Sequence, residues 1–226
     1  KEPIIIAGHS ISIGASVGIA MYPHDALDAE ELMTRADLAM YESKRNGKSG
    51  VLFYSEDLNY HANERTRMIR ELRTAMEAQQ FDVHYQPKVC IKTHELVGLE
   101  ALLRWQHPTR GTLLPAEFIP FAEDHGMMAA IDESVLDRVA EDLVTWEEQS
   151  LDLVPVSVNV SAAFVLREDL FDTINAMIER TKVDPNYLEF ELTESVLRAE
   201  YVDTRRALAR IHAMGIGFWQ NDFGAG

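Results

Sequence analysis

The sequence predicts an α/β fold, with a parallel sheet that is either open or closed into a barrel, preceded by a shorter α+β region. Two observations support this. Residues 81–221 alternate between strand-like and helix-like segments, and repeated strand–helix units favour a parallel sheet. Residues 1–54 follow a different order, in which a strand, one long helix and a closing strand succeed one another. A charged helical stretch separates the two patterns.

The first region begins with a strand pattern over residues 10–21, where apolar residues partly alternate with small or polar ones. Asp28, followed three residues later by Glu31, predicts a helix start, because the first backbone amides of a helix need acceptors. Asn46 and Gly47 predict the end of that helix, since glycine readily adopts the left-handed cap conformation. Residues 51–54 are then expected to form the closing strand.

Residues 56–79 predict a second helix that is highly charged and has one apolar side, formed by Met68, Ile69, Leu72 and Met76. We interpret it as an amphipathic helix that packs on its neighbours, and a signalling helix that moves is the alternative. The predicted organisation is therefore a first domain over 1–54, a connector helix over 55–79 and a second domain over 80–226.

The second region carries the longer series of elements. Strands are predicted at 81–88, 96–105, 154–160, 188–192 and 216–221, and helices at 115–123, 129–148, 164–180 and 202–214. The chain stops directly after the last strand, with no helix to cover it. We therefore expect both ends to be cuts within a longer protein.

Composition restricts the partners and the compartment. The formal net charge of −16 would repel a nucleic-acid backbone, so DNA and RNA polymers are not expected to bind. A small phosphate ligand is compatible with this charge if cations lie between it and the carboxylates. Cys90 is the single cysteine, which fits a reducing cytoplasm. No apolar run approaches the roughly 20 residues of a transmembrane helix, and the first residues do not resemble a signal peptide.

Oxygen-bearing side chains lie in or at the end of four of the predicted strands. In a parallel barrel the strand ends converge on one face, so these side chains would meet and form a site suited to Mg²⁺ or Mn²⁺. The alternative is that they only solvate the strand ends. Glu191 argues against that alternative, because a carboxylate in a buried strand needs a counter-charge or a metal. The candidate residues are Glu100, Asn159, Glu191, Asn221 and Asp222.

These segments also resemble the EAL phosphodiesterase family of cyclic-di-GMP turnover, over residues 81–226 and in the family's order. A lone Glu-Ala-Leu would carry no information, but six motifs in the same order are specific. The matching segments are 85–88 (YQPK), 100–105 (EALLRW), 115–123 (PAEFIPFAE), 157–161 (SVNVS), 191–195 (ELTES) and 221–226 (NDFGAG). The resemblance implies a TIM-like (β/α) barrel, here truncated.

Residues 1–54 resemble the C-terminal part of a GGDEF domain, an α+β nucleotide-cyclase-like fold. The similar segments are 15–20 (ASVGIA) before Tyr22-Pro23, then 35–41 (RADLAMY) and 44–47 (KRNG). The loop that names this family and binds metal and nucleotide would lie upstream, so this piece is not expected to synthesise cyclic-di-GMP. Lys44 and Arg45 resemble the family's phosphate-facing basic pair, with a solvated helix end as the alternative.

The EAL resemblance implies a phosphodiesterase that uses two divalent metals, Mg²⁺ or Mn²⁺, and opens cyclic-di-GMP to linear pGpG. It assigns catalytic metal ligation to Glu100, Glu191 and Asp222, with Asn159 as a further ligand. Substrate contacts are implied for Gln86 and Arg104, since a guanidinium can fork onto a phosphate. Glu194 matches a glutamate that steadies a loop at the metal site.

Two departures from the family pattern are visible. Asn221 stands where the family has an aspartate shared between the metals, and a neutral amide with one oxygen should bridge two cations poorly. We therefore expect weaker metal binding and slower hydrolysis than in a standard member. The family's later lysine, its general-base glutamate and about three of the eight barrel strands would lie beyond Gly226. The isolated piece is expected to be inactive and poorly soluble, because an incomplete barrel exposes strand edges.

Two other functions stay open. Asn221 favours a degenerate EAL domain that senses cyclic-di-GMP without cutting it, whereas the metal-ligand residues present favour the enzyme. An unrelated barrel enzyme with an oxygen-ligated metal is the third alternative, and the ordered motifs disfavour it. The resemblance is also compatible with a homodimer formed through EAL domains and with an upstream sensor domain. The sequence leaves open whether a cytoplasmic parent protein is anchored in a membrane.

Overall fold

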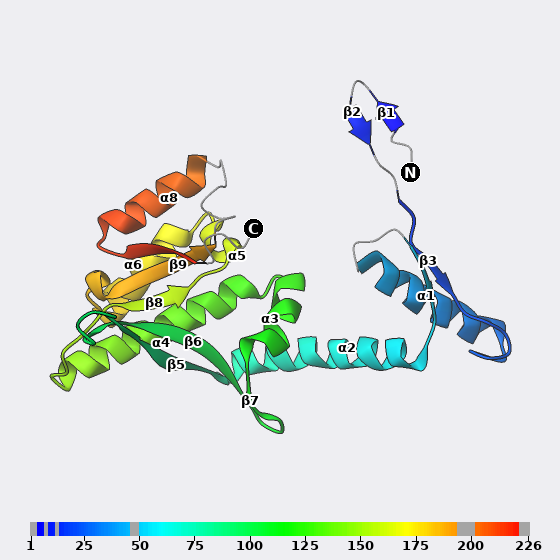
Figure 1. Ribbon diagram of the computed structural model, residues 1–226, viewed down its shortest axis with the longest axis horizontal. Helices are drawn as coiled ribbons and strands as arrows, with labels where there is room; N and C mark the ends of the chain where they lie inside the picture. Colours follow the sequence, from blue (N-terminus) through cyan, green and yellow to red (C-terminus); the bar gives the residue numbers. More distant parts are fainter. Residues whose placement is uncertain (1–3, 7–8, 12–13, 46–49, 194–201, 222–226) are drawn as a thin grey trace. The chain divides into compact units, whose positions relative to one another are not determined.

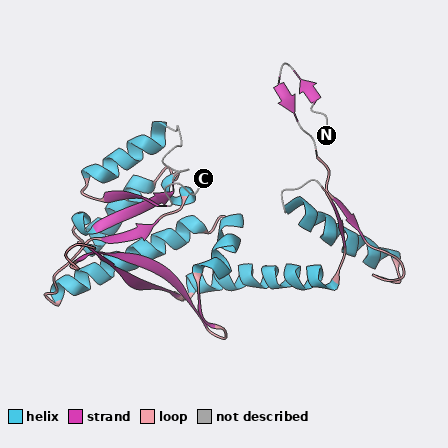
Figure 2. Ribbon diagram, viewed as in Figure 1, coloured by secondary structure: helices cyan, strands magenta, loops and turns pink. Residues whose placement is uncertain are grey.

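The structure is a computed structural model that describes residues 4–6, 9–11, 14–45, 50–193 and 202–221 (Figure 1). The chain divides into two compact units, residues 1–68 and residues 69–226. Figure 2 shows that both units combine helices with strands.

In the first unit, the long helix α1 (Ala29–Arg45) connects two parallel strands, β3 (Val17–Ile19) and β4 (Val51–Phe53). Parallel strands need such a crossover, because a tight turn cannot bring the chain back in the same direction. Two further short strands, β1 (Ile4–Ile6) and β2 (His9–Ile11), pair antiparallel. The single strand predicted for residues 10–21 was therefore too long.

The predicted start of α1 is confirmed. The backbone N–H of Glu31 donates to Oδ1 of Asp28 at 2.8 Å, so this carboxylate satisfies one of the free amides of the first turn. The predicted helix end at Asn46 and Gly47 lies outside the described residues.

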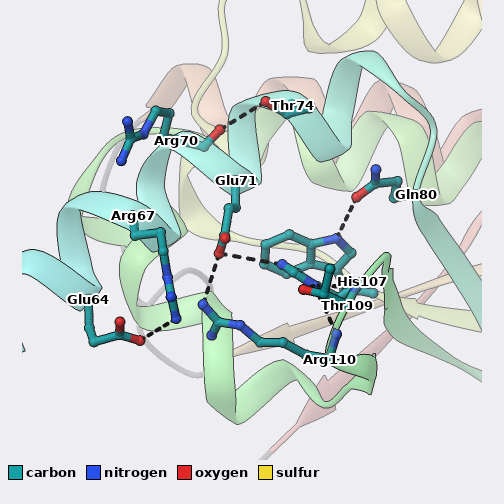
Figure 3. Close-up of polar contacts among 10 residues, drawn as sticks. Glu64, Arg67, Arg70, Glu71, Thr74, Gln80, His107, Thr109 and Arg110 are labelled. Carbon is teal, nitrogen blue, oxygen red and sulfur yellow. Dashed lines mark hydrogen bonds and ion pairs between the residues drawn. The ribbon is translucent and has the colours of Figure 1, made fainter.

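The predicted second helix is present as α2 (Glu56–Glu77), and the division between the units falls within it. In its C-terminal half Leu72 and Ala75 are fully buried, which supports the interpretation as an amphipathic, packed helix. Figure 3 shows the polar contacts of Glu71 in this half of α2. The carboxylate of Glu71 accepts a hydrogen bond from Arg110 at 3.0 Å and lies 3.4 Å from Nε2 of His107.

The second unit is built on a mixed sheet with the strand order β10-β9-β8-β6-β5, and β7 pairs with β6 outside this order. The strands are β5 (Phe81–Val89), β6 (Leu96–His107), β7 (Gly111–Leu113), β8 (Val156–Asn159), β9 (Leu188–Thr193) and β10 (Gly217–Asn221). From β6 to β10 the neighbours run parallel, as predicted.

The prediction of a parallel sheet was wrong for β5 and β6, which pair antiparallel. Only residues 90–95 separate the two strands, and a connection that short cannot make the crossover that a parallel pair requires. The strand β7 also pairs antiparallel with β6.

The helices of this unit follow the parallel strands along the chain. They are α3 (Pro115–Asp124), α4 (Met128–Glu148), α5 (Ala162–Val165), α6 (Leu170–Thr181) and α8 (Val202–Ala213), with a short 3-10 helix, η1 (Pro185–Tyr187). Helix α4 packs on α6, and α6 packs on α8 (Figure 1).

The single helix predicted for residues 164–180 is divided into α5 and α6. The side chain of Arg167 binds both carboxylate oxygens of Asp169 at 2.8 Å and Oε2 of Glu133 in α4 at 2.5 Å. These contacts hold the residues between the two helices in a turn.

The two faces of the sheet differ in character, because successive side chains of a strand point to opposite sides. Val156, Val158 and Phe190 are buried and belong to the face on which the helices pack. Asn159 and Glu191 belong to the opposite face, where polar side chains collect. Among the described helices, none has the length and apolar character that crossing a membrane requires.

Candidate functional site

Three of the predicted site residues come together on the polar face of the sheet. Glu100 lies in β6, Asn159 is the last residue of β8, and Glu191 lies in β9. Asn159 and Glu191 are paired in the parallel register of β8 and β9. The side-chain amide of Asn159 donates from Nδ2 to Oε1 of Glu100 at 3.0 Å. The pairing of the strands thus gathers two carboxylates and one amide.

A lysine to which sequence reasoning assigned no role contacts this cluster. Nζ of Lys88, in β5, lies 2.5 Å from Oε1 of Glu191 and 2.6 Å from Oγ of Ser157. Only 10% of the Glu191 side chain is exposed, so this carboxylate is nearly buried and has a charged partner. The expectation that a buried Glu191 needs a counter-charge or a metal is consistent with this ion pair. Lys88 is two residues after Gln86, and that spacing could have placed it on the same face.

The two predicted substrate contacts, Gln86 and Arg104, lie on the strands β5 and β6. Gln86 is paired with Glu100 in the antiparallel register of β5 and β6, and its side chain is exposed. Arg104 lies four residues after Glu100 in β6 and therefore on the same face of that strand. Its Nη1 donates to the carbonyl oxygen of Leu103 at 2.8 Å. Gln86 therefore lies next to Glu100, whereas Arg104 lies farther along β6.

The remaining predicted site residues are Asn221, Asp222 and Glu194. Asn221 is the last residue of β10 and pairs with Thr193, two residues after Glu191 on the neighbouring strand. The side chain of Asn221 lies outside the described part of the chain, as do Asp222 and Glu194. Their assignment to the site stays a prediction.

A second residue missed by sequence reasoning supports the end of β8. Oδ2 of Asp132, in α4, accepts a hydrogen bond from the backbone N–H of Ser161 at 2.9 Å. Asp132 is buried, and this burial raises the pKa of its carboxyl to about 6. A carboxylate within the apolar positions of α4, beside Ile131 and Val135, was the signal that could have identified it.

A cavity of about 370 Å³ adjoins the cluster. Most of its walls are apolar, and Glu123, Asp132, Asn159 and Glu191 contribute the acidic and amide groups. An opening that is mainly apolar with a few convergent polar groups is typical of a small-molecule site.

The donor set suits a hard divalent cation. The carboxylates of Glu100 and Glu191 and the amide oxygen of Asn159 are the ligand types that Mg²⁺ and Mn²⁺ prefer. Among the described residues, no group of three or more His, Cys, Asp or Glu side chains is close enough to hold a metal by itself. The chemistry of the residues present therefore fits the implied metals, with the amide as a necessary member of the set.

The comparison with known families agrees with this geometry. The family model of the EAL domain matches residues 69–226. The chain belongs to the EAL domain family. A second family model, described as diguanylate cyclase, GGDEF domain, matches residues 1–50. The predicted combination of GGDEF-domain residues followed by EAL-domain residues is confirmed.

Curated relatives match the whole of this chain. The bifunctional diguanylate cyclase/cyclic di-GMP phosphodiesterase MucR of Pseudomonas aeruginosa is 36% identical over 226 residues, which are 100% of this chain and 33% of MucR. The cyclic di-GMP phosphodiesterase NbdA of the same organism is also 36% identical over 226 residues, or 100% of this chain and 29% of NbdA. The chain thus spans about a third of the length of these relatives.

Solved structures support the fold. A MucR phosphodiesterase in complex with c-di-GMP is 34% identical, with a TM-score of 0.66 over 71% of this chain and 65% of that one. The EAL domain of Xanthomonas citri FimX, also in complex with c-diGMP, is 23% identical with a TM-score of 0.66 over 74% and 65% of the two chains. The expected α/β, TIM-like architecture of the EAL part is confirmed.

Proposed function

We propose that this EAL domain is the catalytic part of a metal-dependent cyclic-di-GMP phosphodiesterase that produces linear pGpG. The observation that carries the proposal is the assembly of Glu100, Asn159 and Glu191 on one face of three parallel strands. In barrels of this class the carboxyl ends of the strands bear the active site. The relatives MucR and NbdA, whose names include this activity, support the same assignment.

The metal-ligand residues would act as a group. Divalent ions held by Glu100, Asn159 and Glu191, and by Asp222 beyond them, would polarise the scissile phosphate and offset the carboxylate charge. This offset matters because the chain carries a formal net charge of −16, and the substrate is itself an anion. The nearly buried position of Glu191 excludes most water and so strengthens its interaction with a cation.

Gln86 and Arg104 would bind and orient the substrate. Among the described residues, the Arg104 guanidinium donates to the carbonyl oxygen of Leu103, and a guanidinium has further N–H groups that can bind a phosphate oxygen. Gln86 pairs in register with Glu100, and an amide at that place can bind the nucleotide next to the carboxylates. Lysine in place of Arg104 would lose the planar fork and bind the phosphate less specifically.

The test is the conversion of cyclic-di-GMP to pGpG by the complete parent protein with Mg²⁺, with Mn²⁺ and with EDTA. We expect turnover with either metal and none with EDTA. Glu100→Gln and Glu191→Gln should each lower the rate by at least about 100-fold, because a neutral amide is a much weaker ligand. Glu147→Gln, an exposed change of the same type in α4, serves as the matched control. Equal rates in all four proteins would contradict the proposal.

A second candidate function is a receptor that binds cyclic-di-GMP without hydrolysing it, and Asn221 favours it. The amide would remove one negative ligand from the metal site while Gln86 and Arg104 remain to hold the nucleotide. The Asn221→Asp variant separates the two functions. A receptor would bind cyclic-di-GMP without turnover and would gain activity in the variant. An enzyme would turn over already, and the variant would bind metal more tightly.

Homodimerisation through EAL domains, an upstream sensor domain and a cytoplasmic location of these domains are further proposals that rest on the family resemblance.

A further inference from the structure

Lys88 forms an ion pair with Glu191, one of the proposed metal ligands, and its position results from several independent features. Nζ lies 2.5 Å from Oε1 of Glu191 and 2.6 Å from Oγ of Ser157, which is fully buried. The hydroxyl of Ser157 in turn donates to the carbonyl oxygen of Leu99 at 3.3 Å. The oxygen of Ser157 is therefore oriented to accept from the lysine rather than to donate to it.

The lysine reaches Glu191 across two intervening strands. Lys88 lies in β5 and Glu191 in β9, with β6 and β8 between them in the sheet. Gly98 faces Lys88 in the register of β5 and β6, and a Cβ at this glycine would lie 3.8 Å from Cδ of Lys88 and 3.1 Å from the carbonyl oxygen of Pro155. A larger residue at position 98 would occupy the space over which the lysine stem extends.

We propose that Lys88 is a built-in counter-ion of the metal site, which holds Glu191 when no divalent cation is bound and lowers the affinity of the site for that cation. This inference rests on the proposed function. Glu191 is nearly buried, and a buried carboxylate without a partner is strongly destabilising. The ammonium supplies that partner in the metal-free protein, and the incoming metal must displace it.

The expected size of the effect follows from the charges. A unit positive charge about 5 Å from a divalent ion, even with the screening of bulk water, raises the dissociation constant about tenfold. If Lys88 instead moves away when the metal binds, its contacts with Glu191 and Ser157 are lost, and this loss also raises the dissociation constant of the metal. Both routes predict that removal of the ammonium strengthens metal binding.

The test compares Lys88→Met with Lys92→Met, a matched change at an exposed lysine in the connection between β5 and β6. In the complete parent protein, Mn²⁺ is titrated calorimetrically, and the melting temperature is measured in EDTA and in Mn²⁺. We expect Lys88→Met to lower the dissociation constant for Mn²⁺ about tenfold, to melt earlier in EDTA and to gain more from Mn²⁺ than the wild type. Lys92→Met should change none of the three. A combined Lys88→Met/Glu191→Gln variant should recover the melting temperature in EDTA, because the unpaired carboxylate is gone.

The measurements distinguish a failure of the Lys88 proposal from a failure of the metal site. Unchanged or weaker Mn²⁺ binding by Lys88→Met, with binding by the wild type intact, would overturn the role of Lys88 and leave the phosphodiesterase standing. An absence of Mn²⁺ binding by the wild type and by Lys88→Met would overturn the metal site, and both proposals with it. If Lys88→Met does not fold, Lys88→Gln keeps a polar group near Ser157 and allows the same comparison.

Discussion

The carboxylate of Asp132 in α4 accepts a hydrogen bond from the backbone N–H of Ser161, with 2.9 Å between Oδ2 and the nitrogen. Ser161 follows Asn159 by two residues, so this contact fixes the chain directly after the strand that carries a proposed metal ligand. The contact links α4 to the site. The Asp132 carboxylate is buried there, and its negative charge destabilises the folded state.

Asp132 should make the stability of the EAL domain depend on pH. Burial raises the pKa of its carboxyl from 3.8 to about 6, so the folded state holds the proton more tightly than the unfolded state between these values. The ionised group therefore destabilises the fold above pH 6, and this penalty disappears as the pH falls from 6 towards 4. A difference of about two in pKa corresponds to about 3 kcal/mol.

The Asp132→Asn variant tests this directly, because its carbonyl can still accept from Ser161 but no longer titrates. We expect the variant to exceed the wild type in free energy of unfolding by up to about 3 kcal/mol at pH 7, and the difference to narrow at pH 4. Urea unfolding at both pH values measures it, with Asp172→Asn in α6 as an exposed control. A difference that is the same at both pH values would contradict the account.

The polar contacts of Glu71 should stabilise the C-terminal half of α2. Its carboxylate binds Arg110 and lies near the buried ring of His107 (Figure 3). Glu71→Ala leaves these groups without that acceptor, and we expect a loss of about 1–2 kcal/mol in the free energy of unfolding. Glu77→Ala, at an exposed position of the same helix, should cost less than about 0.5 kcal/mol. Equal losses in the two variants would show that the contacts of Glu71 do not contribute to the free energy of unfolding.

The aromatic core under β6 and α3 should be sensitive to truncation. Phe118 is fully buried, and its ring lies 5.6 Å from that of Trp105 and 5.8 Å from that of Phe81. We expect Phe118→Ala to lower the free energy of unfolding by about 3–5 kcal/mol, through lost burial and a residual cavity. Ile91, which is 89% exposed, provides the contrast, and Ile91→Ala should be nearly neutral. Chemical denaturation of both variants checks the prediction, which fails if their losses are similar.

The close contact between β3 and α1 should exclude any side chain at Gly18. A Cβ there would lie 2.0 Å from the carbonyl oxygen of Ala36 and 2.2 Å from the backbone nitrogen of Met40. Backbone atoms of a helix cannot yield by so much, so we expect Gly18→Ala to destabilise the first unit by about 3 kcal/mol or more. Hydrogen exchange in α1 would measure this, with Ser16→Ala as the control. Unchanged protection in α1 would contradict the packing.

The fold could be predicted wherever local pattern determines it. The alternation within residues 156–159 identified β8, and the carboxylate of Asp28 identified the start of α1. The antiparallel pairing of β5 with β6 was missed because a general strand–helix pattern says nothing about the direction of the first strand. The break before α6 was missed because it depends on the contacts of Arg167 with Asp169 and with Glu133 on another helix.

The site could be predicted only where its residues lie in segments with a recognisable local pattern. Glu100, Asn159 and Glu191 lie in strand segments that the sequence marks, and the sheet brings them together. The ion pair of Lys88 with Glu191 joins positions 103 residues apart across two other strands, and no local pattern reports such a contact. Asp132 was missed because its partner is a backbone N–H, which every residue type except proline provides.

The central claim is that the carboxylates of this sheet belong to a metal-dependent cyclic-di-GMP phosphodiesterase. The most direct measurement is the amount of pGpG formed from cyclic-di-GMP in Mg²⁺ by the complete wild-type parent protein and by its Glu191→Gln variant, side by side. The account predicts that the wild type forms pGpG and that Glu191→Gln forms at least about 100-fold less in the same time. Equal product from both proteins, or none from a wild type that binds Mg²⁺, would contradict it.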